Sequence, residues 1–404
     1  MSRKKNLFNE IKLVYPGKQD ERSIIKETPI SDIKAVKTFK RYYDLDGSWS
    51  NMLIFGENLS VLRTLMEDSN IRGKVRLIYI DPPFSTGEEY RVGRSRTGHV
   101  SHSNEDEVAY ADVLQGYEYL EFLRKRLVLL KEILADDGSI YVHVDCRVGH
   151  YVKVIMDEIF GEENFRNDIA RIKCNPKNFE RRAYGNIKDM ILFYTKTKDY
   201  VWNGSFEDYT EEEIRELFPK IDKYGRRYTT TPLHAPGETR NGPTGQPWRG
   251  IMPPKGRHWR YPPEELERLD REGLIEWSST GNPRKIIYAD EYIKKKKKRQ
   301  DVWKFKDPPY PSYPTEKNLE MLKTIVEASS NRGDIVLDCF AGSGTTMVAA
   351  EELGRRWIGV DNSPLAIKVA ISRILAIENY RPFTLYAAME LPQTLKEFLQ
   401  QQST

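Results

Sequence analysis

The chain has 404 residues, of which 39% are hydrophobic, 11% aromatic and 31% charged. This composition excludes a disordered chain, which has too few apolar residues to bury, and a protein that crosses a membrane several times. The 64 lysine and arginine residues against 60 aspartate and glutamate residues give a net charge of +4, too small to indicate a nucleic-acid partner by itself.

Apolar runs and cysteines set further limits. The sequence holds no apolar run of about 18 residues, and its first residues lack the apolar stretch of a signal peptide, so we expect a cytoplasmic protein. The three cysteines, Cys146, Cys174 and Cys339, show no paired ligand spacing. Neither a disulfide framework nor a zinc site is therefore predicted.

Strand and helix patterns alternate after an N-terminal extension over 1–50 that is polar and mixed in charge. Runs rich in β-branched and aromatic residues predict strands, and apolar residues at helical spacing predict helices. In chain order we expect a strand at 52–55, a helix at 59–66, a strand at 75–80, a helix at 120–134, a strand at 139–144 and a helix at 150–160. Asp137-Gly138 is expected to close the helix before 139–144. Residues 85–110 show no period and predict a long functional or mobile loop.

The composition changes between 165 and 300, where Pro, Gly, Trp, Tyr, Arg and Lys accumulate, and we interpret this range as an inserted module. A strand predicted at 190–194 belongs either to this module or to the main sheet. After it the alternation resumes at 316–330 (helix), 334–338 (strand), 345–353 (helix) and 357–361 (strand). This pattern predicts an α/β fold with a doubly wound, mostly parallel sheet. Its two halves are expected at 51–164 and 301–380, with a tail at 381–404.

A glycine-rich turn follows the predicted strand 334–338, where Asp338, Gly342 and Gly344 lead directly into a helix. This arrangement brings backbone close to a ligand at a helix N-terminus. Asp361 ends the next strand, where doubly wound folds place a carboxylate that holds ribose hydroxyls. A ligand with a ribose is one interpretation. The other is structural: the glycines permit close helix packing, and Asp361 caps the following helix.

A second motif, Asp81-Pro82-Pro83-Phe84, directly follows the predicted strand 75–80, so Asp81 lies at a strand's carboxyl end. Nearly the same text recurs at Asp307-Pro308-Pro309-Tyr310, but there it follows a short, charged segment instead of a buried strand. We therefore place the functional motif at Asp81, because a motif is supported by its structural context and not by its sequence alone. A simple strand-ending turn is the structural alternative.

Together, residues 81–84 and 338–346 resemble the paired signature of the S-adenosylmethionine-dependent DNA amino-methyltransferases. Because the tetrapeptide precedes the glycine turn and the insert lies between them, the order resembles the beta class and, within it, the modification subunits of type III restriction systems. The resemblance implies a circularly permuted, Rossmann-like methyltransferase fold with an inserted target-recognition module. It also implies S-adenosylmethionine as cofactor, double-stranded DNA as substrate and no metal.

The resemblance also implies roles for individual residues. The catalytic group would be Asp81, Pro82, Pro83 and Phe84. Asp361 would hold the ribose of the cofactor and Glu57 its adenine amine. The full cofactor-binding set would be Glu57, Asn58, Asp81, Asp338, Phe340, Ala341, Gly342, Ser343, Gly344, Thr345, Thr346 and Asp361. Residues 313–317 resemble the element that opens the helix before the cofactor strand.

The tetrapeptide suits chemistry on an exocyclic amine. The adenine amine is a poor nucleophile because its lone pair is conjugated with the ring, so it needs acceptors for its hydrogens. Asp81 and the Pro82 carbonyl can supply two. The prolines restrict φ and hold these acceptors, while Phe84 offers a flat face for a base turned out of the duplex.

Three functional alternatives are considered: two methylation reactions and a DNA-binding protein that catalyses none. An aspartate at the first position resembles the adenine-modifying branch, whereas cytosine N4-methylating relatives more often carry serine there. Cytosine C5 chemistry is disfavoured because it needs a nucleophilic cysteine after proline, and neither Cys174 nor Cys339 has that setting. Adenine N6-methylation is preferred, cytosine N4-methylation stays open, and a catalytically silent DNA-binding regulator is the alternative of another class.

Basic and aromatic residues of the insert predict the contact with DNA. The candidates are Arg257, Arg260, Lys294, Lys295, Lys296, Lys297 and Lys298, and a solvated face is the alternative for each. His99 and His102, in the long loop, are candidates to close over DNA. We expect Trp248, Trp259, Trp277 and Trp303 to form the core of the insert. A homodimer and a restriction subunit are partners that the resemblance implies.

Overall fold

The computed structural model describes residues 11–40, 49–83, 89–92, 107–111, 114–175, 182–239, 241–309, 311, 313 and 316–402. Phe84, Tyr310, His99 and His102 lie outside these residues. The chain divides into two compact units, which we call the main unit (Met1–Gly204 with Gln300–Thr404) and the insert unit (Ser205–Arg299). None of the described helices is long and apolar enough to span a membrane.

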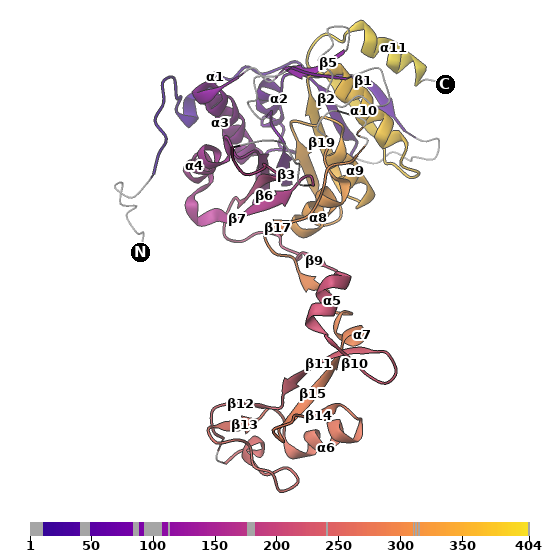
Figure 1. The fold of residues 1–404 in the computed structure, drawn as a ribbon. Coiled ribbons are helices and arrows are strands. Elements are labelled where there is room, and N and C mark those ends of the chain that lie inside the picture. The colour runs from indigo at the N-terminus through magenta and orange to yellow at the C-terminus, as the bar shows by residue number, and fades with distance from the viewer. Residues whose placement is uncertain are drawn as a thin grey trace. The chain divides into compact units, whose positions relative to one another are not determined.

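A ten-stranded sheet forms the centre of the main unit (Figure 1). All neighbours from β20 to β6 run parallel, whereas β1 and β8 run antiparallel to theirs. The predicted doubly wound, mostly parallel sheet is therefore confirmed. The strand order is β1 (Lys34–Phe39), β20 (Phe383–Ala387), β2 (Asn51–Phe55), β19 (Arg356–Asp361), β18 (Ile335–Asp338), β3 (Val75–Ile80), β6 (Leu134–Val144), β8 (Lys188–Thr195), β7 (Phe165–Ile172) and β17 (Val302–Trp303).

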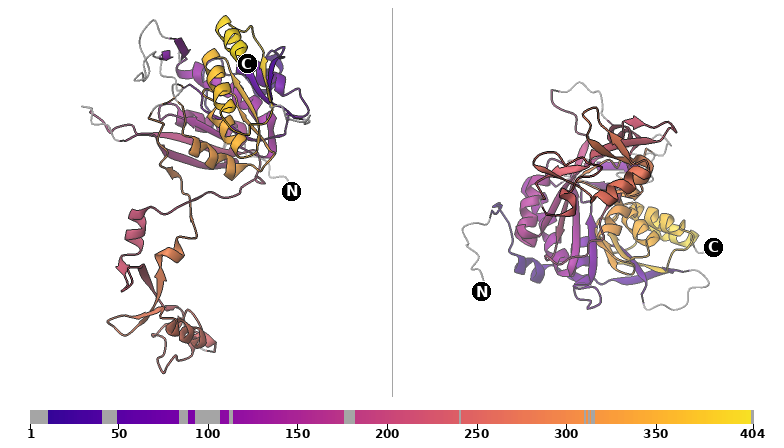
Figure 2. Two further views of the ribbon diagram at one scale, coloured as in Figure 1. Left: turned by 90° about the vertical axis from the view of Figure 1, so that its right-hand side faces the viewer. Right: turned by 90° about the horizontal axis from the view of Figure 1, so that it is seen from below.

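Helices cover both faces of this sheet (Figures 1 and 2). On one face lie α1 (Glu21–Glu27), α2 (Asn58–Leu65), α3 (Gly116–Ile133) and α4 (Gly149–Phe160). On the other lie α8 (Leu319–Ser329), α9 (Thr345–Glu352), α10 (Pro364–Leu375) and α11 (Gln393–Gln401). A sheet with helices on both faces is the arrangement that the alternating strand and helix patterns predicted.

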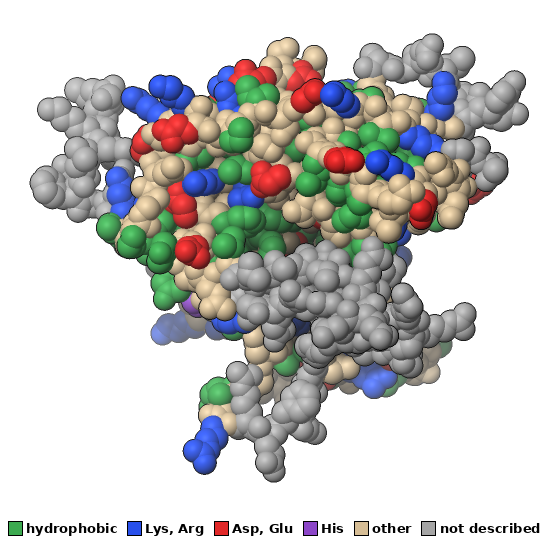
Figure 3. Space-filling view, turned by 90° about the horizontal axis from the view of Figure 1, so that it is seen from above, with side chains coloured by type: hydrophobic (Ala, Val, Ile, Leu, Met, Phe, Trp, Pro, Cys, Tyr) green, Lys and Arg blue, Asp and Glu red, His purple; other side chains and the backbone are tan. Residues whose placement is uncertain are grey.

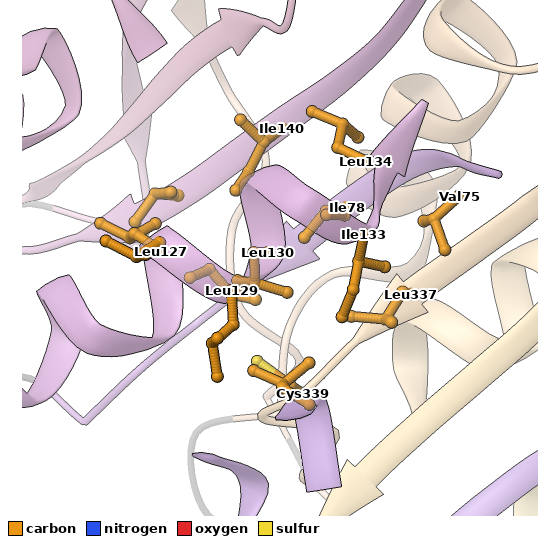
Figure 4. Close-up of a cluster of buried hydrophobic side chains, with 14 of the residues drawn as sticks. Val75, Ile78, Leu127, Leu129, Leu130, Ile133, Leu134, Ile140, Leu337 and Cys339 are labelled. Atoms are coloured by element: carbon orange, nitrogen blue, oxygen red, sulfur yellow. The ribbon is translucent and has the colours of Figure 1, made fainter. Parts of the chain in front are cut away.

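Alternate residues of the central strands bury into the two opposite layers. In β3, Ile78 packs toward α2 and α3, whereas Leu77 and Tyr79 pack toward α8 to α10. Figure 4 shows Ile78 beside Leu337 of β18 and the leucines of α3. Each such side chain contributes about 1.5–3 kcal/mol by leaving water. These contacts fix β3 against β18, the pair that carries the two motifs.

Two local expectations were wrong. Helix α3 ends at Ile133, and β6 begins at once at Leu134, so Asp137 and Gly138 lie inside the strand. The β3–β6 register shifts at this point, and a Cβ on Gly138 would stand 2.9 Å from the Ala135 carbonyl, so glycine permits the irregular path. The expected loop 85–110 also contains a paired hairpin, β4 (Glu89–Val92) with β5 (Glu107–Ala111).

The insert begins later than the predicted residue 165. Both β7 and β8 pair into the main sheet, β8 directly with β6, so residues 165–204 belong to the main unit. The reason is apolar burial: Ile191 and Phe193 of β8 join the core beneath α8. The other interpretation of the strand near 190, as part of the main sheet, is the one that holds.

The insert unit has its own small sheet and core. Its strands form a four-stranded sheet and two short ribbons, with α5 (Glu211–Leu217), α6 (Pro263–Arg271) and α7 (Ala289–Tyr292). The sheet order is β10 (Lys220–Ile221), β11 (Arg227–Pro232), β15 (Pro283–Tyr288) and β14 (Ile275–Trp277); the ribbons pair β12 (His234–Pro236) with β13 (Arg257–Trp259) and β9 (Phe206–Glu207) with β16 (Lys297–Lys298).

The four tryptophans expected in the insert core divide into three groups. Trp248 and Trp259 are buried there with Leu233. Trp277 stacks on Trp248 with ring centroids 5.6 Å apart but stays 41% exposed. Trp303 lies in the main unit, packed into its core, because β17 pairs with β7. Two of the four therefore meet the expectation.

Candidate active site

Two motifs far apart in the sequence meet at one edge of the sheet. Strands β3 and β18 pair in parallel, so their carboxyl ends, which lead into Asp81 and the glycine turn, lie side by side. A cavity of about 490 Å³ opens there, within the usual range for small-ligand sites. Of the predicted site residues, its lining includes Glu57, Asn58, Asp81, Pro82, Pro83, Asp338, Phe340, Ala341, Gly342, Ser343, Thr345, Thr346 and Asp361.

The two glycines of the turn have different tasks. Both have left-handed backbone, with φ of 49° at Gly342 and 77° at Gly344, which favours glycine. Gly342 lines the cavity, and its N–H donates to Asp361 at 2.8 Å. Gly344 begins α9, and a Cβ there would stand 2.9 Å from the Ala370 Cβ. Gly344 thus serves helix packing, as the structural interpretation of the turn expected.

Two carboxylates hold the turn from below. Asp338 accepts from the Phe340 N–H at 2.9 Å and from the Thr346 hydroxyl at 2.6 Å. Burial raises the pKa of Asp338 to about 7, against these hydrogen bonds, and the charges of Asp81 and Asp361 add to the rise. Desolvation likewise raises the pKa of Asp361. No lysine or arginine in the described part of the chain forms an ion pair with either carboxylate, so a cationic ligand would be stabilised here.

Arg126 of α3, which no sequence pattern indicated, organises the other end of the cavity. Its guanidinium donates to Glu57 and to the Asn58 side-chain oxygen, both at 2.5 Å, and lies 3.4 Å from the centroid of the Phe122 ring. Desolvation lowers the pKa of Arg126 to about 10, opposed by the charge of Glu57. The Glu57 side chain is 47% exposed, so Arg126 orients a carboxylate that a ligand can still reach.

Asp81 is held by a second cation that was not predicted to contact it. The Lys317 ammonium lies 2.7 Å from Asp81 Oδ2, and both side chains are largely buried. The other oxygen, Oδ1, is buried and has no hydrogen-bond partner among the described residues. Lys317 therefore fixes one oxygen of the carboxylate and leaves the second able to accept a hydrogen bond.

Known proteins identify this combination of motifs. A family model described as DNA methylase matches residues 75–372. The chain is also 41% identical over 397 residues to the type II methyltransferase M.EcaI of Enterobacter cloacae, an alignment that covers 96% of this chain and 83% of the relative. The chain belongs to the N6/N4 DNA methylase family. It is an S-adenosylmethionine-dependent DNA methyltransferase.

This methylase is also similar to two further relatives. It is 35% identical over 335 residues to the DNA adenine methyltransferase YhdJ of Escherichia coli K12, covering 83% of this chain and 86% of YhdJ. It is 28% identical over 350 residues to the type III StyLTI Mod subunit of Salmonella typhimurium, covering 75% of this chain but 50% of the subunit. The resemblance to type III subunits thus exists, but M.EcaI shares more of the sequence.

The cavity of the methylase fits S-adenosylmethionine. Asp338 and Asp361 suit its positive charges, because a nearby cation offsets their burial. Phe122 and Phe340, with ring centroids 6.1 Å apart, offer flat apolar surfaces suited to a purine. The residues that line the cavity therefore agree with the methyl donor of the family.

The second Asp-Pro-Pro segment has another task. Asp307 accepts from Arg171, a fully buried residue of β7, and its N–H donates to the Lys173 carbonyl at 2.9 Å. It does not line the cavity. Asp307 therefore neutralises a buried arginine, and the choice of Asp81 as the functional aspartate stays a prediction.

The candidate DNA contacts of the insert unit also differ from one another. Lys296 pairs with Asp208 at 3.3 Å, and Lys297 pairs with Glu207 and Glu213 at 2.9 and 2.5 Å. These two lysines are already neutralised. Lys294, Lys295 and Lys298 are exposed.

Arg257 and Arg260 are arranged differently, around β12 and β13. Arg257 lies 3.1 Å from the His234 ring, and Arg260 donates to the Pro232 carbonyl. Desolvation and the charges of Arg257, Arg260 and Arg284 lower the pKa of His234. Within the described ranges, no carboxylate pairs with these arginines. Figure 3 shows a contrasting face of the molecule, seen from above, where acidic and basic side chains are interspersed.

Proposed function

We propose that this methylase transfers a methyl group to the exocyclic N6 amine of an adenine turned out of duplex DNA. The observation that carries the proposal is that Asp81 lines the cavity beside the glycine turn, and that its buried Oδ1 has no hydrogen-bond partner among the described residues. The aspartate at the first motif position and the 35% identity to YhdJ, named as an adenine methyltransferase, support adenine over cytosine.

Asp81 and Pro82 prepare the amine for reaction. An acceptor at Asp81 Oδ1 and the Pro82 carbonyl would each draw one amine hydrogen, which localises the nitrogen lone pair. When bound, S-adenosylmethionine supplies a methyl group on a positively charged sulfur. The chain then contributes mostly alignment, because the acceptors stand on a rigid strand end. Phe84, for which stacking on the base is predicted, lies outside the described residues.

The cofactor would extend along the glycine turn. We assign the methionine part to residues 340–343, 345 and 346, the ribose to Asp361 and the adenine amine to Glu57. The hydrogen bonds of Asp361 with Gly342 and Ser363 hold the carboxylate in one orientation. Arg126 does the same for Glu57. Gly344 is removed from the contact set, since its position serves packing against Ala370.

DNA would be recognised by the insert unit. Arg257 and Arg260, which have no carboxylate partner within the described residues, are assigned to phosphate contacts, whereas Lys297 is tied to two glutamates. The relation to M.EcaI supports a type II restriction-modification system, with a separate restriction enzyme as partner. A homodimer stays a prediction that light scattering after size-exclusion chromatography tests.

Analysis of the methylated product tests the function. Duplex DNA methylated by the purified enzyme should yield N6-methyladenine after digestion to nucleosides, and N4-methylcytosine in its place would overturn the assignment. Asp81→Asn should lower the methylation rate by about a thousandfold, because it removes the charged acceptor, with cofactor binding nearly unchanged. Asp307→Asn is the matched control in the second Asp-Pro-Pro segment and should keep most activity. A reversed pattern would refute the site.

A further inference from the structure

A buried histidine stands behind Asp81 and outside the cavity lining. His143 of β6 is fully buried, and its Nδ1 lies 3.9 Å from Asp81 Oδ1 and 2.8 Å from the Tyr79 hydroxyl. Its Nε2 lies 3.3 Å from Asp189 Oδ2 of β8. The chain thus places carboxylate, imidazole and carboxylate in one row, and the Asp81 oxygen nearest the imidazole is the one for which the described residues supply no hydrogen-bond partner.

The far carboxylate is ionised. Burial alone would raise the pKa of Asp189, but the hydrogen bonds from His143 and Lys173 outweigh it and hold that pKa below its usual range. Lys173 lies 2.7 Å and Arg171 3.4 Å from Asp189. An ionised carboxylate only accepts hydrogen bonds, so His143 carries its proton on Nε2.

The other ring nitrogen is then a base that faces Asp81. With the proton on Nε2, Nδ1 has a lone pair and accepts from the Tyr79 hydroxyl. Burial lowers the pKa of His143, and the positive charge of Lys317 lowers it further, while Asp189 and Asp81 raise it. The resting imidazole is therefore neutral and able to take a proton.

We propose that His143 and Asp189 form a relay that receives, through Asp81, the proton that the target amine loses on methylation. The inference rests on the proposed role of Asp81 as the acceptor of the target amine. Neither His143 nor Asp189 touches the reacting atoms. Both act through Asp81. Because Lys317 binds Oδ2, Oδ1 is the oxygen that accepts the proton.

The step balances as follows in atoms and charge. The amine lone pair forms the new N–C bond as the C–S bond breaks and its electron pair stays on sulfur. The amine nitrogen then holds one proton too many; this N–H bond breaks, its electron pair stays on nitrogen, and the proton goes to Asp81 Oδ1. Rotation of the Tyr79 hydroxyl releases the Nδ1 lone pair, a carboxylate shift of about 1 Å brings Oδ1 within hydrogen-bond distance of His143, and the proton passes to Nδ1. It returns to water through Asp81 once the product has left.

The pH dependence of single-turnover methylation tests the relay. Among the described residues, the charged and titratable groups that face His143 include Tyr79 and Asp81 from β3, Asp189 from β8, and Lys317 before α8. The relay needs neutral His143, so the rate falls as the pH drops through its pKa. Asp189→Asn removes a charge that raises this pKa. It should therefore move the acid limb to lower pH and slow the reaction about tenfold at its optimum.

His143→Gln keeps hydrogen-bonding atoms but takes up no proton. It should slow the reaction at least as much as Asp189→Asn and remove the acid limb that His143 causes. Tyr141→Phe, also in β6 but bonded to Ser329, is the matched control and should keep the wild-type profile. Titrations with cofactor and with DNA, done on each variant, should give wild-type affinities.

A measurement on the protein without cofactor gives a second readout. In ¹⁵N-histidine-labelled protein, the His143 signals, assigned by their absence in His143→Gln, should report a neutral ring with the proton on Nε2 at pH 7. If His143→Gln does not fold, Asp189→Asn assigns the signals and carries the kinetic test. A His143 that is charged at pH 7 would overturn the relay.

Other outcomes separate this inference from the proposed function. Wild-type pH profiles in both relay variants, or slower rates that follow weaker cofactor or DNA binding, would refute the relay. If Asp81→Asn is inactive while His143→Gln is unaffected, the relay alone fails. If Asp81→Asn is fully active, the proposed function fails with it.

Discussion

The buried cations of the main unit and two arginines of the insert unit differ in their partners. In the main unit, three buried cations are paired: Arg126 with Glu57, Lys317 with Asp81, and Arg171 with Asp189. In the insert unit, Arg257 and Arg260 have no carboxylate partner within the described residues. Chemistry needs groups held in one geometry at low dielectric, whereas a polyanion is bound by cations that are not already neutralised. The comparison therefore separates catalysis from recognition by charge pairing.

The two units also differ in the size of their cores. The main unit has an extensive apolar layer on each face of a ten-stranded sheet. Among the described residues, the main apolar cluster of the insert unit has five buried members, Leu233, Trp248, Trp259, Leu266 and Leu269. A small unit buries a smaller share of its surface and is less stable. Damage to the insert core should therefore remove recognition and leave the cofactor site intact.

The largest effect is expected from Trp259→Ala. Truncation of a buried tryptophan costs about 3–5 kcal/mol, which a core of this size cannot absorb. Limited proteolysis should cut within 205–299, and specific DNA binding should be lost, while calorimetry finds cofactor binding unchanged. Trp277→Ala, at an exposed tryptophan in the same unit, is the control and should stay resistant. Loss of cofactor binding in Trp259→Ala would show that the two units are not separable.

Next in size is Arg126→Gln, which attacks the pairing in the main unit. It leaves Glu57 and Asn58 without their shared donor and removes the cation beside Phe122. We expect cofactor affinity, measured by calorimetry, to fall by about tenfold to a hundredfold. Lys125→Gln, on the same helix but outside the cavity, should bind the cofactor as wild type does. Equal affinities in both variants would remove Arg126 from the site.

A smaller effect is expected from the double variant Arg257→Ala with Arg260→Ala. Loss of two phosphate contacts should weaken DNA binding about tenfold at moderate salt and reduce the salt slope by about two. The control removes the same charge from arginines that are already paired: Arg249, bound to Glu267, and Arg268, bound to Glu265. Fluorescence anisotropy at several salt concentrations measures both. A steeper loss in the control pair would contradict the assignment.

The smallest effect concerns Asp338 and the pH. Its pKa is raised to about 7 in the folded protein, so above the unfolded value, near pH 4, the folded state binds more protons and stability falls as the pH rises toward 7. Asp338→Asn carries no charge and escapes this loss. Its Tm should exceed that of wild type by a few degrees at pH 8 and by less at pH 5. A constant difference across this range would mean that Asp338 is ionised at both pH values.

Much of the fold was predictable because its signals are local. The strands near 52–55 and 75–80, the glycine turn and the Asp-Pro-Pro segment each follow from a few consecutive residues. The end of α3 was misplaced, because Asp137 and Gly138 look like a helix stop but lie in a strand whose register shifts. Likewise, the start of the insert was placed too early, since β7 and β8 join the main sheet only through long-range pairing.

The sequence by itself determined the alternating α/β pattern and the two motifs, and with them the family, because hydrophobic period and turn residues act over short stretches. Only the tertiary structure decided which side chains hold these motifs. Arg126 reaches Glu57, Lys317 reaches Asp81, and His143 stands between Asp81 and Asp189. A buried charge is stabilised by whatever lies within a few ångströms of it. Those neighbours are set by the order of strands in the sheet, which no local pattern encodes.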